Sequence, residues 1–252
     1  MTVDAAAYLG SWPLRPIEAK VSDLTNTMRE NRIKEALVSP LEGFFYADPT
    51  PANDRLLRRL AKRKKLWAAP IINLRMADWR QRIEELAGRR QVRAVRLAPS
   101  FHGYEVAEAR EAVHAAAECG LATVVQLRVQ DERSHPPILK LPAVPLAEVI
   151  ALAVAEPGAR VVASAARLAE AQAQAEHLRQ LGNLWLDISH FDGLACVKQA
   201  CEAVGAERLL FSTNYPFFYA RSAALKIQEE ELARGQAQAV MAGNARTAFG
   251  IS

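Results

Sequence analysis

The stretch RLLFSTNYPF, residues 208–217, places an apolar run directly before polar and aromatic turn residues. A helical segment follows it, and then the sequence GNARTAFG at residues 243–250. The apolar run has the length of a buried strand, and turn-forming residues mark its end. A buried strand followed by a helix is one unit of a parallel α/β fold.

The same unit recurs along the whole chain. Apolar runs predict eight strands, at residues 2–6, 34–39, 67–73, 92–98, 122–128, 159–164, 183–188 and 207–213. Helical periodicity lies between them, at residues 53–64, 77–88, 106–119, 146–155, 166–181 and 194–204. Eight strands alternating with helices close a (β/α)8 TIM barrel, and 252 residues is a usual length for one. We therefore predict a single α/β barrel domain over residues 1–252.

Composition and charge exclude several classes of protein. Half of the residues are hydrophobic and 24% are charged, which is typical of a globular domain with a substantial core. The net charge of +4 includes a basic run at residues 58–65, which we expect to end a helix on a solvated face and not to bind nucleic acid. No apolar run approaches the ~20 residues of a membrane span. With no leader pattern and only three cysteines, without metal spacing, we expect a cytoplasmic protein.

The two ends of the chain resemble the amidohydrolase-related family, which includes decarboxylase-like and lactonase-like members. In that family the last strand reads glycine or serine, any residue, aspartate, tyrosine or phenylalanine, proline, and a G-N-A-x-x-x-x-G helix closes the chain. The opening VDAAAYLG, residues 3–10, is similar to the family's apolar residue, D-x-H-x-H and glycine. Residues 95–104 and 187–189 resemble its fourth and seventh strands. The resemblance implies an amidohydrolase-like barrel with its site at the carboxyl ends of the strands.

The residues that would hold a metal ion in that family are replaced. By the resemblance, Ala6 and Tyr8 take the places of two first-strand histidines, Gln126 that of a fifth-strand histidine, Ser164 or Ala165 that of a sixth-strand histidine, and Asn214 that of the last-strand aspartate. A zinc site needs several His, Asp or Glu side chains converging on one point. We therefore predict no metal and no cofactor, and no metal-dependent hydrolysis. An asparagine amide also lacks the basicity to take a proton from water.

Two interpretations of the altered site remain open. Ala6, Tyr8, Gln126 and Asn214 could form a neutral, hydrogen-bonded core. Alternatively, the barrel mouth binds a small anionic ligand, since arginines offer forked donors and aromatic rings offer apolar area. The predicted substrate-binding residues are Tyr8, Trp12, Arg75, Arg96, Tyr104, Gln126, Arg128, Asn214 and Tyr215.

Two functions follow from these interpretations. The first is a pseudoenzyme that binds a small anion or a partner protein. The alternative is a metal-independent hydrolase or lyase acting on a carboxylate-bearing or lactone substrate, with His102, His135 or His190 transferring protons and Asn214 positioning the substrate. The aromatic runs at residues 43–46 and 215–219 could lie in a subunit interface. Because barrels of the resembled family often form dimers, we expect a homo-oligomer.

Overall fold

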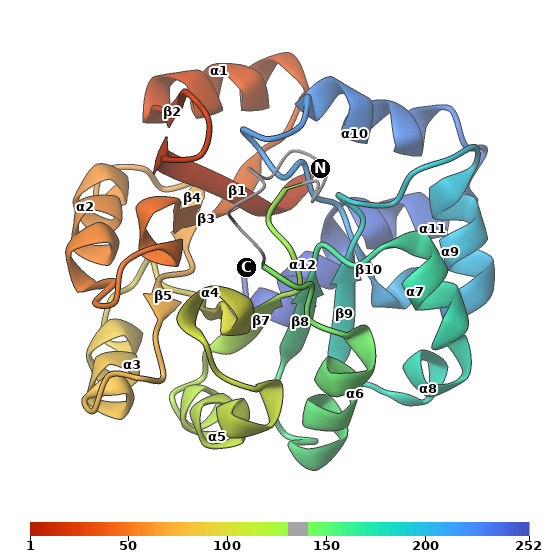
Figure 1. Ribbon diagram of the computed structural model, residues 1–252. Coiled ribbons are helices and arrows are strands. Elements are labelled where there is room, and N and C mark those ends of the chain that lie inside the picture. The colour runs from red at the N-terminus through yellow and green to blue at the C-terminus, as the bar shows by residue number, and fades with distance from the viewer. Residues whose placement is uncertain (131–140, 252) are drawn as a thin grey trace.

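The computed structural model describes residues 1–130 and 141–251, and a ring of parallel strands surrounded by helices is its main feature (Figure 1). The strands of the ring are β1 (Val3–Trp12), β3 (Glu35–Pro40), β4 (Leu66–Ala68) with β5 (Ile71–Ile72), β6 (Ala94–Leu97), β7 (Ala122–Gln126), β8 (Val161–Ser164), β9 (Leu184–Asp187) and β10 (Leu209–Leu210). They form two hydrogen-bonded arcs, in which β1, β3 and β4 are one and β5 to β10 the other.

Backbone hydrogen bonds join the two arcs at both seams. At the first seam, the Ala5 amide donates to the Phe211 carbonyl at 2.9 Å and the Tyr8 amide to the Tyr215 carbonyl at 2.8 Å. At the second seam, Ala68 forms a parallel bridge with Val92. The ring of eight strand positions is therefore a (β/α)8 barrel, as the sequence predicted.

A strand is present at all eight predicted places, although β1 extends to Trp12, well beyond its predicted end at residue 6, and β10 covers only Leu209–Leu210 of the predicted range 207–213. The third is interrupted between β4 and β5, next to Pro70, which has no amide hydrogen to give to the ladder. The structure adds one strand that the sequence did not reveal, β2 (Ile17–Ala19), which pairs antiparallel with the end of β1.

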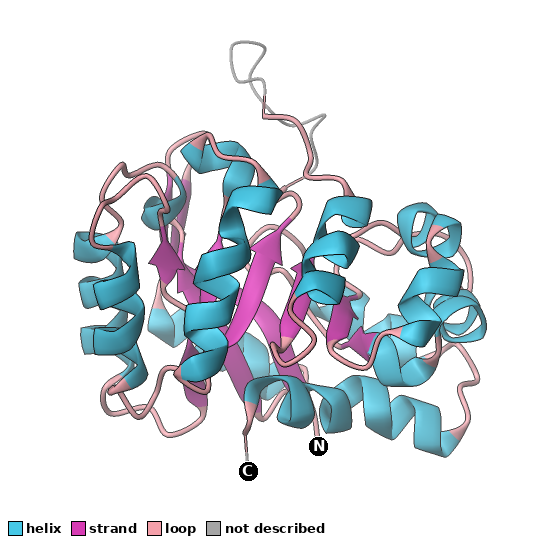
Figure 2. Ribbon diagram, turned by 90° about the horizontal axis from the view of Figure 1, so that it is seen from below, coloured by secondary structure: helices cyan, strands magenta, loops and turns pink. Residues whose placement is uncertain are grey.

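Helices cover the outside of the ring (Figure 2). Those on the first half are α1 (Val21–Glu30), α2 (Thr50–Leu60), α3 (Trp79–Ala87), α4 (Pro99–His102) and α5 (Arg110–Glu118). Those on the second half are α6 (Leu146–Ala155), α7 (Leu168–Ala173), α8 (Ala175–Gln180), α9 (Cys196–Val204), α10 (Ala220–Gln228), α11 (Arg234–Gln238) and α12 (Asn244–Phe249). Within the described residues, no helix is long and apolar enough to cross a membrane.

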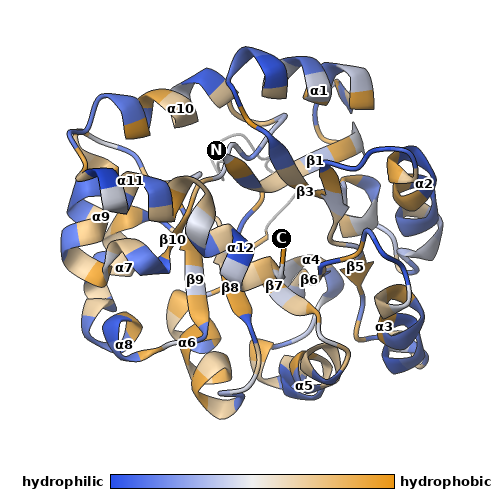
Figure 3. Ribbon diagram, turned by 180° about the vertical axis from the view of Figure 1, so that it is seen from behind, coloured by the Kyte–Doolittle hydropathy of each residue, from blue (hydrophilic) through white to orange (hydrophobic). Residues whose placement is uncertain are grey.

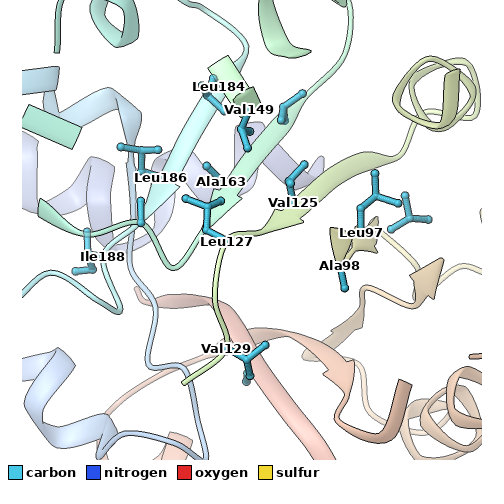
Figure 4. Packing of buried hydrophobic residues seen from close by; sticks show 14 of the residues in the cluster. Leu97, Ala98, Val125, Leu127, Val129, Val149, Ala163, Leu184, Leu186 and Ile188 are labelled. Carbon is cyan, nitrogen blue, oxygen red and sulfur yellow. The ribbon is translucent and has the colours of Figure 1, made fainter. Parts of the chain in front are cut away.

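Alternation along each strand divides the core into two parts. One set of side chains points outward to the helices, and Figure 4 shows Val125, Ala163 and Leu186 on successive strands with Val149 of α6 against them. The other set fills the inside of the barrel toward the amino-terminal end of the strands. There α12 crosses the opening (Figure 3). Its Phe249 packs with the inward-facing residues.

Candidate functional site

A layer of polar side chains lies inside the barrel above this apolar plug. Five of its six members follow an inward-facing apolar residue by two positions, so they share that residue's direction, whereas Tyr8 follows Ala5 across a register shift in β1 between Asp4 and Ala7. Thus Ser39 follows Leu37, Arg96 follows Ala94, and Gln126 follows Val124. The layer consists of Tyr8, Ser39, Arg96, Gln126, Ser164 and Asp187, none of which is more than 2% exposed.

The guanidinium of Arg96 is the centre of this layer. Its Nε donates to Ser39 Oγ at 2.8 Å, and its Nη1 donates to Tyr8 Oη at 3.4 Å and to Ser164 Oγ at 3.2 Å. Nη1 also donates to Gln126 Oε1, and the guanidinium lies over the Tyr8 ring, 5.2 Å from its centroid. Side chains from five strands of the barrel therefore meet at one buried cation.

This arrangement differs from the neutral core that the sequence suggested. Tyr8 and Gln126 do bond to each other, with the Tyr8 hydroxyl donating to Gln126 Oε1 at 3.1 Å. However, both are partners of a guanidinium, so the core carries a charge. Arg96 is also not available as an exposed ligand-binding group, because it is fully buried. Burial raises the pKa of the Tyr8 hydroxyl, with Arg96 opposing that effect, so Tyr8 is a neutral phenol.

A carboxylate, that of Asp187, lies one hydrogen bond away from Arg96. Ser164 Oγ donates to Asp187 Oδ2 at 2.7 Å, and the Ala165 amide donates to the same oxygen at 2.9 Å. On its other side, Asp187 Oδ1 accepts from Ser189 Oγ at 2.5 Å. Ser189 Oγ in turn lies 3.1 Å from His190 Nδ1. A series of hydrogen bonds through Asp187, Ser189 and His190 thus leads from the barrel interior toward its rim.

These bonds select one tautomer of His190. Because the Ser189 hydroxyl donates its hydrogen to Asp187, its oxygen is free to accept one from Nδ1 of the imidazole. The other nitrogen, Nε2, has no hydrogen-bond partner within the described residues. Burial lowers the pKa of His190 to about 4, although Asp187 opposes the shift. His190 is therefore a neutral imidazole with a lone pair on Nε2 at pH 7.

A pocket of about 960 Å³ lies beside His190, at the carboxyl ends of β9 and β10. Its polar lining includes Ser189, Thr213, the basic residues Arg167 and Lys226 and the acidic residue Asp192, and its apolar lining is Phe191, Phe217, Phe218, Tyr219 and Ala223. Lys226, from α10, donates to the Phe191 carbonyl, and burial lowers the pKa of its ammonium. The pocket thus combines cationic groups with aromatic walls, as a site for an aromatic or aliphatic carboxylate would.

Only some of the predicted ligand-binding residues are near this pocket. Tyr215, which is half-buried, adjoins the pocket-lining turn, and its amide donates to Thr213 Oγ1 at 3.1 Å. Arg128 is 5% exposed and forms a two-pronged ion pair with Glu170, with Nη1 at 2.9 Å from Oε2. Asn214 is fully buried, and its Nδ2 donates to the Val129 carbonyl at 2.8 Å.

The other predicted ligand-binding residues do not line this pocket, and each has a structural partner in the protein. Trp12 is packed edge-on against Phe45 and Phe217, with ring centroids 4.8 and 4.9 Å away. The Tyr104 hydroxyl accepts from the Ala98 amide at 3.1 Å, and burial raises its pKa. Arg75 lies on the rim, where it pairs with Glu108 at 2.8 Å.

The histidines predicted to transfer protons have different environments. His102 Nε2 lies 3.2 Å from the Gly43 carbonyl, and burial lowers the pKa of its ring. His135 lies outside the described residues. His190 is thus the described histidine of the three that lines the pocket. Of the aromatic runs predicted for an interface, Phe44 is fully buried and Tyr219 is 86% exposed, so only parts of those runs are available to a partner.

The residues present do not fit a metal ion. Tyr8, Gln126 and Ser164 present neutral oxygens that already accept hydrogen bonds from a cation. The carboxylate that bonds to this layer, Asp187, accepts from four donors of Ser164, Ala165 and Ser189. Over residues 1–130 and 141–251, no group of three or more His, Cys, Asp or Glu side chains could hold a metal. Zinc and manganese prefer imidazole and carboxylate ligands, which this centre lacks.

Comparison with known proteins agrees with the barrel fold. The amidohydrolase family matches residues 13–251, so the chain belongs to the amidohydrolase family. No curated protein sequence matches the chain.

Solved structures show the same fold at low sequence identity. The 5-carboxyvanillate decarboxylase of Sphingomonas paucimobilis is 14% identical with a TM-score of 0.71, over 100% of this chain and 99% of that one. A dihydroxybenzoic acid decarboxylase of Polaromonas, solved with bound manganese, is 12% identical with a TM-score of 0.73, over 99% and 97% of the two chains. An uncharacterised TIM-barrel protein of Bordetella bronchiseptica is 14% identical with a TM-score of 0.73, over 99% and 98%.

Several residues of the site were not predicted from the sequence. Ser39 and Asp187 each end an apolar strand, at even spacing from the inward-facing residues, so the period-two pattern could have identified them. Lys226 lies on α10, far along the chain from the strand ends, and no local pattern indicates that it reaches the pocket.

Proposed function

We propose that this protein is a metal-independent member of the amidohydrolase family that binds a small carboxylate-bearing molecule. The pocket over β9 and β10 is the observation that supports this function, because it places Lys226 and Arg167 among aromatic walls. A carboxylate would lie near the cations, and its apolar body would lie against Phe217 and Phe218. Several structural neighbours are named as decarboxylases of hydroxybenzoates, whose substrates have this combination of groups.

Calorimetric titration with benzoate and 4-hydroxybenzoate tests the proposal, with neutral benzamide as the matched probe. We expect the carboxylates to bind and benzamide to bind much more weakly. Lys226→Gln should weaken benzoate binding by about tenfold, which is the effect of losing one charge-assisted hydrogen bond. Lys62→Gln, at an exposed position after α2, is the control and should bind benzoate as the native protein does. Equal binding of benzoate and benzamide would contradict the proposal.

The Asp187–Ser189–His190 chain favours a second function, metal-independent hydrolysis at the same pocket. In it, His190 Nε2 takes a proton from water as the water oxygen bonds to a lactone carbonyl carbon, and the ring C–O bond breaks. The proton then passes from His190 to the leaving oxygen, so the products are a hydroxy acid and the unchanged imidazole. Neutral His190 has the lone pair that this step requires.

Opening of an aromatic lactone such as dihydrocoumarin separates the two functions. Under hydrolysis, His190→Gln abolishes turnover, and His102→Gln, which alters a ring bonded to the Gly43 carbonyl, retains it. Under the binding function, the native protein opens the lactone no faster than buffer does, while benzoate still binds.

A further inference from the structure

We infer that the guanidinium of Arg96 replaces the metal ion of the family as a fixed cation at the centre of the barrel. This goes beyond the proposed function, because it concerns what holds the barrel interior together and not what the pocket binds. It also explains why the family's metal ligands have been exchanged for these particular residues.

The first argument is convergence on one group. Of the positions at which the resembled family carries metal ligands, those occupied by Tyr8, Gln126 and Ser164 all contact Arg96 Nη1. These residues come from β1, β7 and β8, which are far apart in the sequence. Ligands of one ion must converge on one point, and here the point of convergence is a guanidinium nitrogen.

The second argument is the direction of each hydrogen bond. Ser39 Oγ donates to the Ala69 carbonyl at 2.6 Å, and Ser164 Oγ donates to Asp187 at 2.7 Å, so each hydroxyl has its lone pairs left for Arg96. The Gln126 amide nitrogen donates to the Arg128 carbonyl, which turns its oxygen toward Arg96. Each partner of the guanidinium within the described residues therefore presents an oxygen as an acceptor, as the coordination shell of a cation would.

The third argument is charge. The hydrogen-bond partners of Arg96 within the described residues include no carboxylate, and Asp187 is connected to it through Ser164. The guanidinium therefore puts a fixed positive charge at the point where the oxygens converge, and a divalent ion brought to the same point would be repelled by it. It follows that restoring histidine ligands would not by itself restore metal binding while Arg96 remains.

This consequence can be measured in a matched pair of variants. The first carries Tyr8→His, Gln126→His and Ser164→His, and the second carries the same changes together with Arg96→Met. Each is titrated with Co²⁺, whose visible absorption reports tetrahedral or five-coordinate ligation, and with Zn²⁺ in a calorimeter. We expect the variant without Arg96 to bind either ion at least about 100-fold more tightly, because one unit charge is removed from the site. Equal affinity in the two variants would overturn the inference.

A second measurement does not require the histidine variants to fold. Thermal unfolding compares Arg96→Met with Arg96→Lys in the otherwise native protein. If a cation is what the oxygen shell requires, lysine recovers at least half of the melting-temperature loss that methionine causes. If Arg96 serves only as packing, methionine, which matches its apolar stem and cannot bond, is the better tolerated of the two, and the inference fails.

Discussion

Asn214 is the residue where the resemblance to the family is strongest and where the chemistry differs most. Its backbone has φ of 51°, in the left-handed region that asparagine and aspartate adopt more readily than other side chains. The backbone therefore favours the same two residues in this protein and in the family. The side chain decides between them, because Nδ2 donates to the Val129 carbonyl at 2.8 Å.

Restoring the family's aspartate should therefore destabilise the protein. In Asn214→Asp, an ionised oxygen faces the Val129 carbonyl with no hydrogen between them, at a fully buried position. We expect a loss of about 2–3 kcal/mol in the free energy of unfolding at pH 7, measured by urea denaturation. The loss should shrink as the pH is lowered and the new carboxyl becomes protonated. A loss that is the same at pH 5 and pH 7 would show that charge is not its cause.

Tyr8 provides a test of the hydrogen-bond network alone. Tyr8→Phe keeps the ring, which packs edge-on against Phe44 and Phe217 at 5.9 and 6.0 Å. It removes the hydroxyl that donates to Gln126 and accepts from Arg96. We expect unfolding to become easier by about 1–2 kcal/mol in urea. If the variant were more stable than the native protein, the buried hydroxyl would be destabilising despite its hydrogen bonds.

The elements of the fold were largely predictable because strand and helix periods are local properties of the sequence. Eight apolar runs predicted eight strand positions, and the helix pattern at residues 146–155 matches α6 in both bounds. What the sequence did not reveal depends on distant neighbours. β2 exists because it pairs with β1, and the central position of Arg96 depends on side chains from four other strands. Arg96 was predicted to bind a ligand, and only the closed barrel shows that it bonds to the protein.

The short helix α12 closes the amino-terminal end of the barrel. We therefore expect its apolar face to contribute more to the free energy of unfolding than the length of the helix suggests. Phe249, which is 1% exposed, packs with the inward-facing residues Val3, Ala5 and Leu210. Phe249→Ala should cost about 3–5 kcal/mol in the free energy of unfolding. Thr247→Ala on the exposed side of the same helix is the control, with an expected change within about 0.5 kcal/mol. Equal losses in both variants would indicate that burial of Phe249 in the barrel is not what makes α12 stabilising.

Two buried groups, Asp4 and His190, make the stability of the whole molecule depend on pH. Asp4 joins β1 to the segment after β10, since Oδ1 accepts from the Ala6 and Thr213 amides at 3.1 and 3.0 Å and Oδ2 accepts from Thr213 Oγ1. Burial raises the pKa of Asp4 to about 7, and Asp187 adds to the shift, while the hydrogen bonds from Thr213 and Ala6 oppose it. Burial lowers the pKa of His190 to about 4, against the attraction of Asp187.

These shifts have opposite signs in their effect on folding. Between pH 4 and 7 the folded state holds a proton on Asp4 that the unfolded chain has lost, so stability falls as the pH rises, by about 4 kcal/mol in all. Between pH 6.5 and 4 the unfolded chain protonates its histidine and the folded state does not, so stability falls as the pH drops, by about 3 kcal/mol in all. The two slopes largely cancel between pH 4 and 6.5, where the native protein should show a nearly flat profile.

When either group is replaced, the free energy of unfolding should change with pH as the remaining group dictates. Asp4→Asn keeps an oxygen for both amides and a donor for Thr213, so it should fold. Its stability should rise with pH from 4 to 6.5, because the slope due to His190 is no longer opposed by that of Asp4. His190→Gln should show the reverse, with stability falling from pH 4 to 7. Urea denaturation at half-unit pH steps measures all three profiles. Parallel profiles for the two variants would show that neither group sets the pH dependence. Profiles that cross would assign the falling slope to Asp4 and the rising slope to His190.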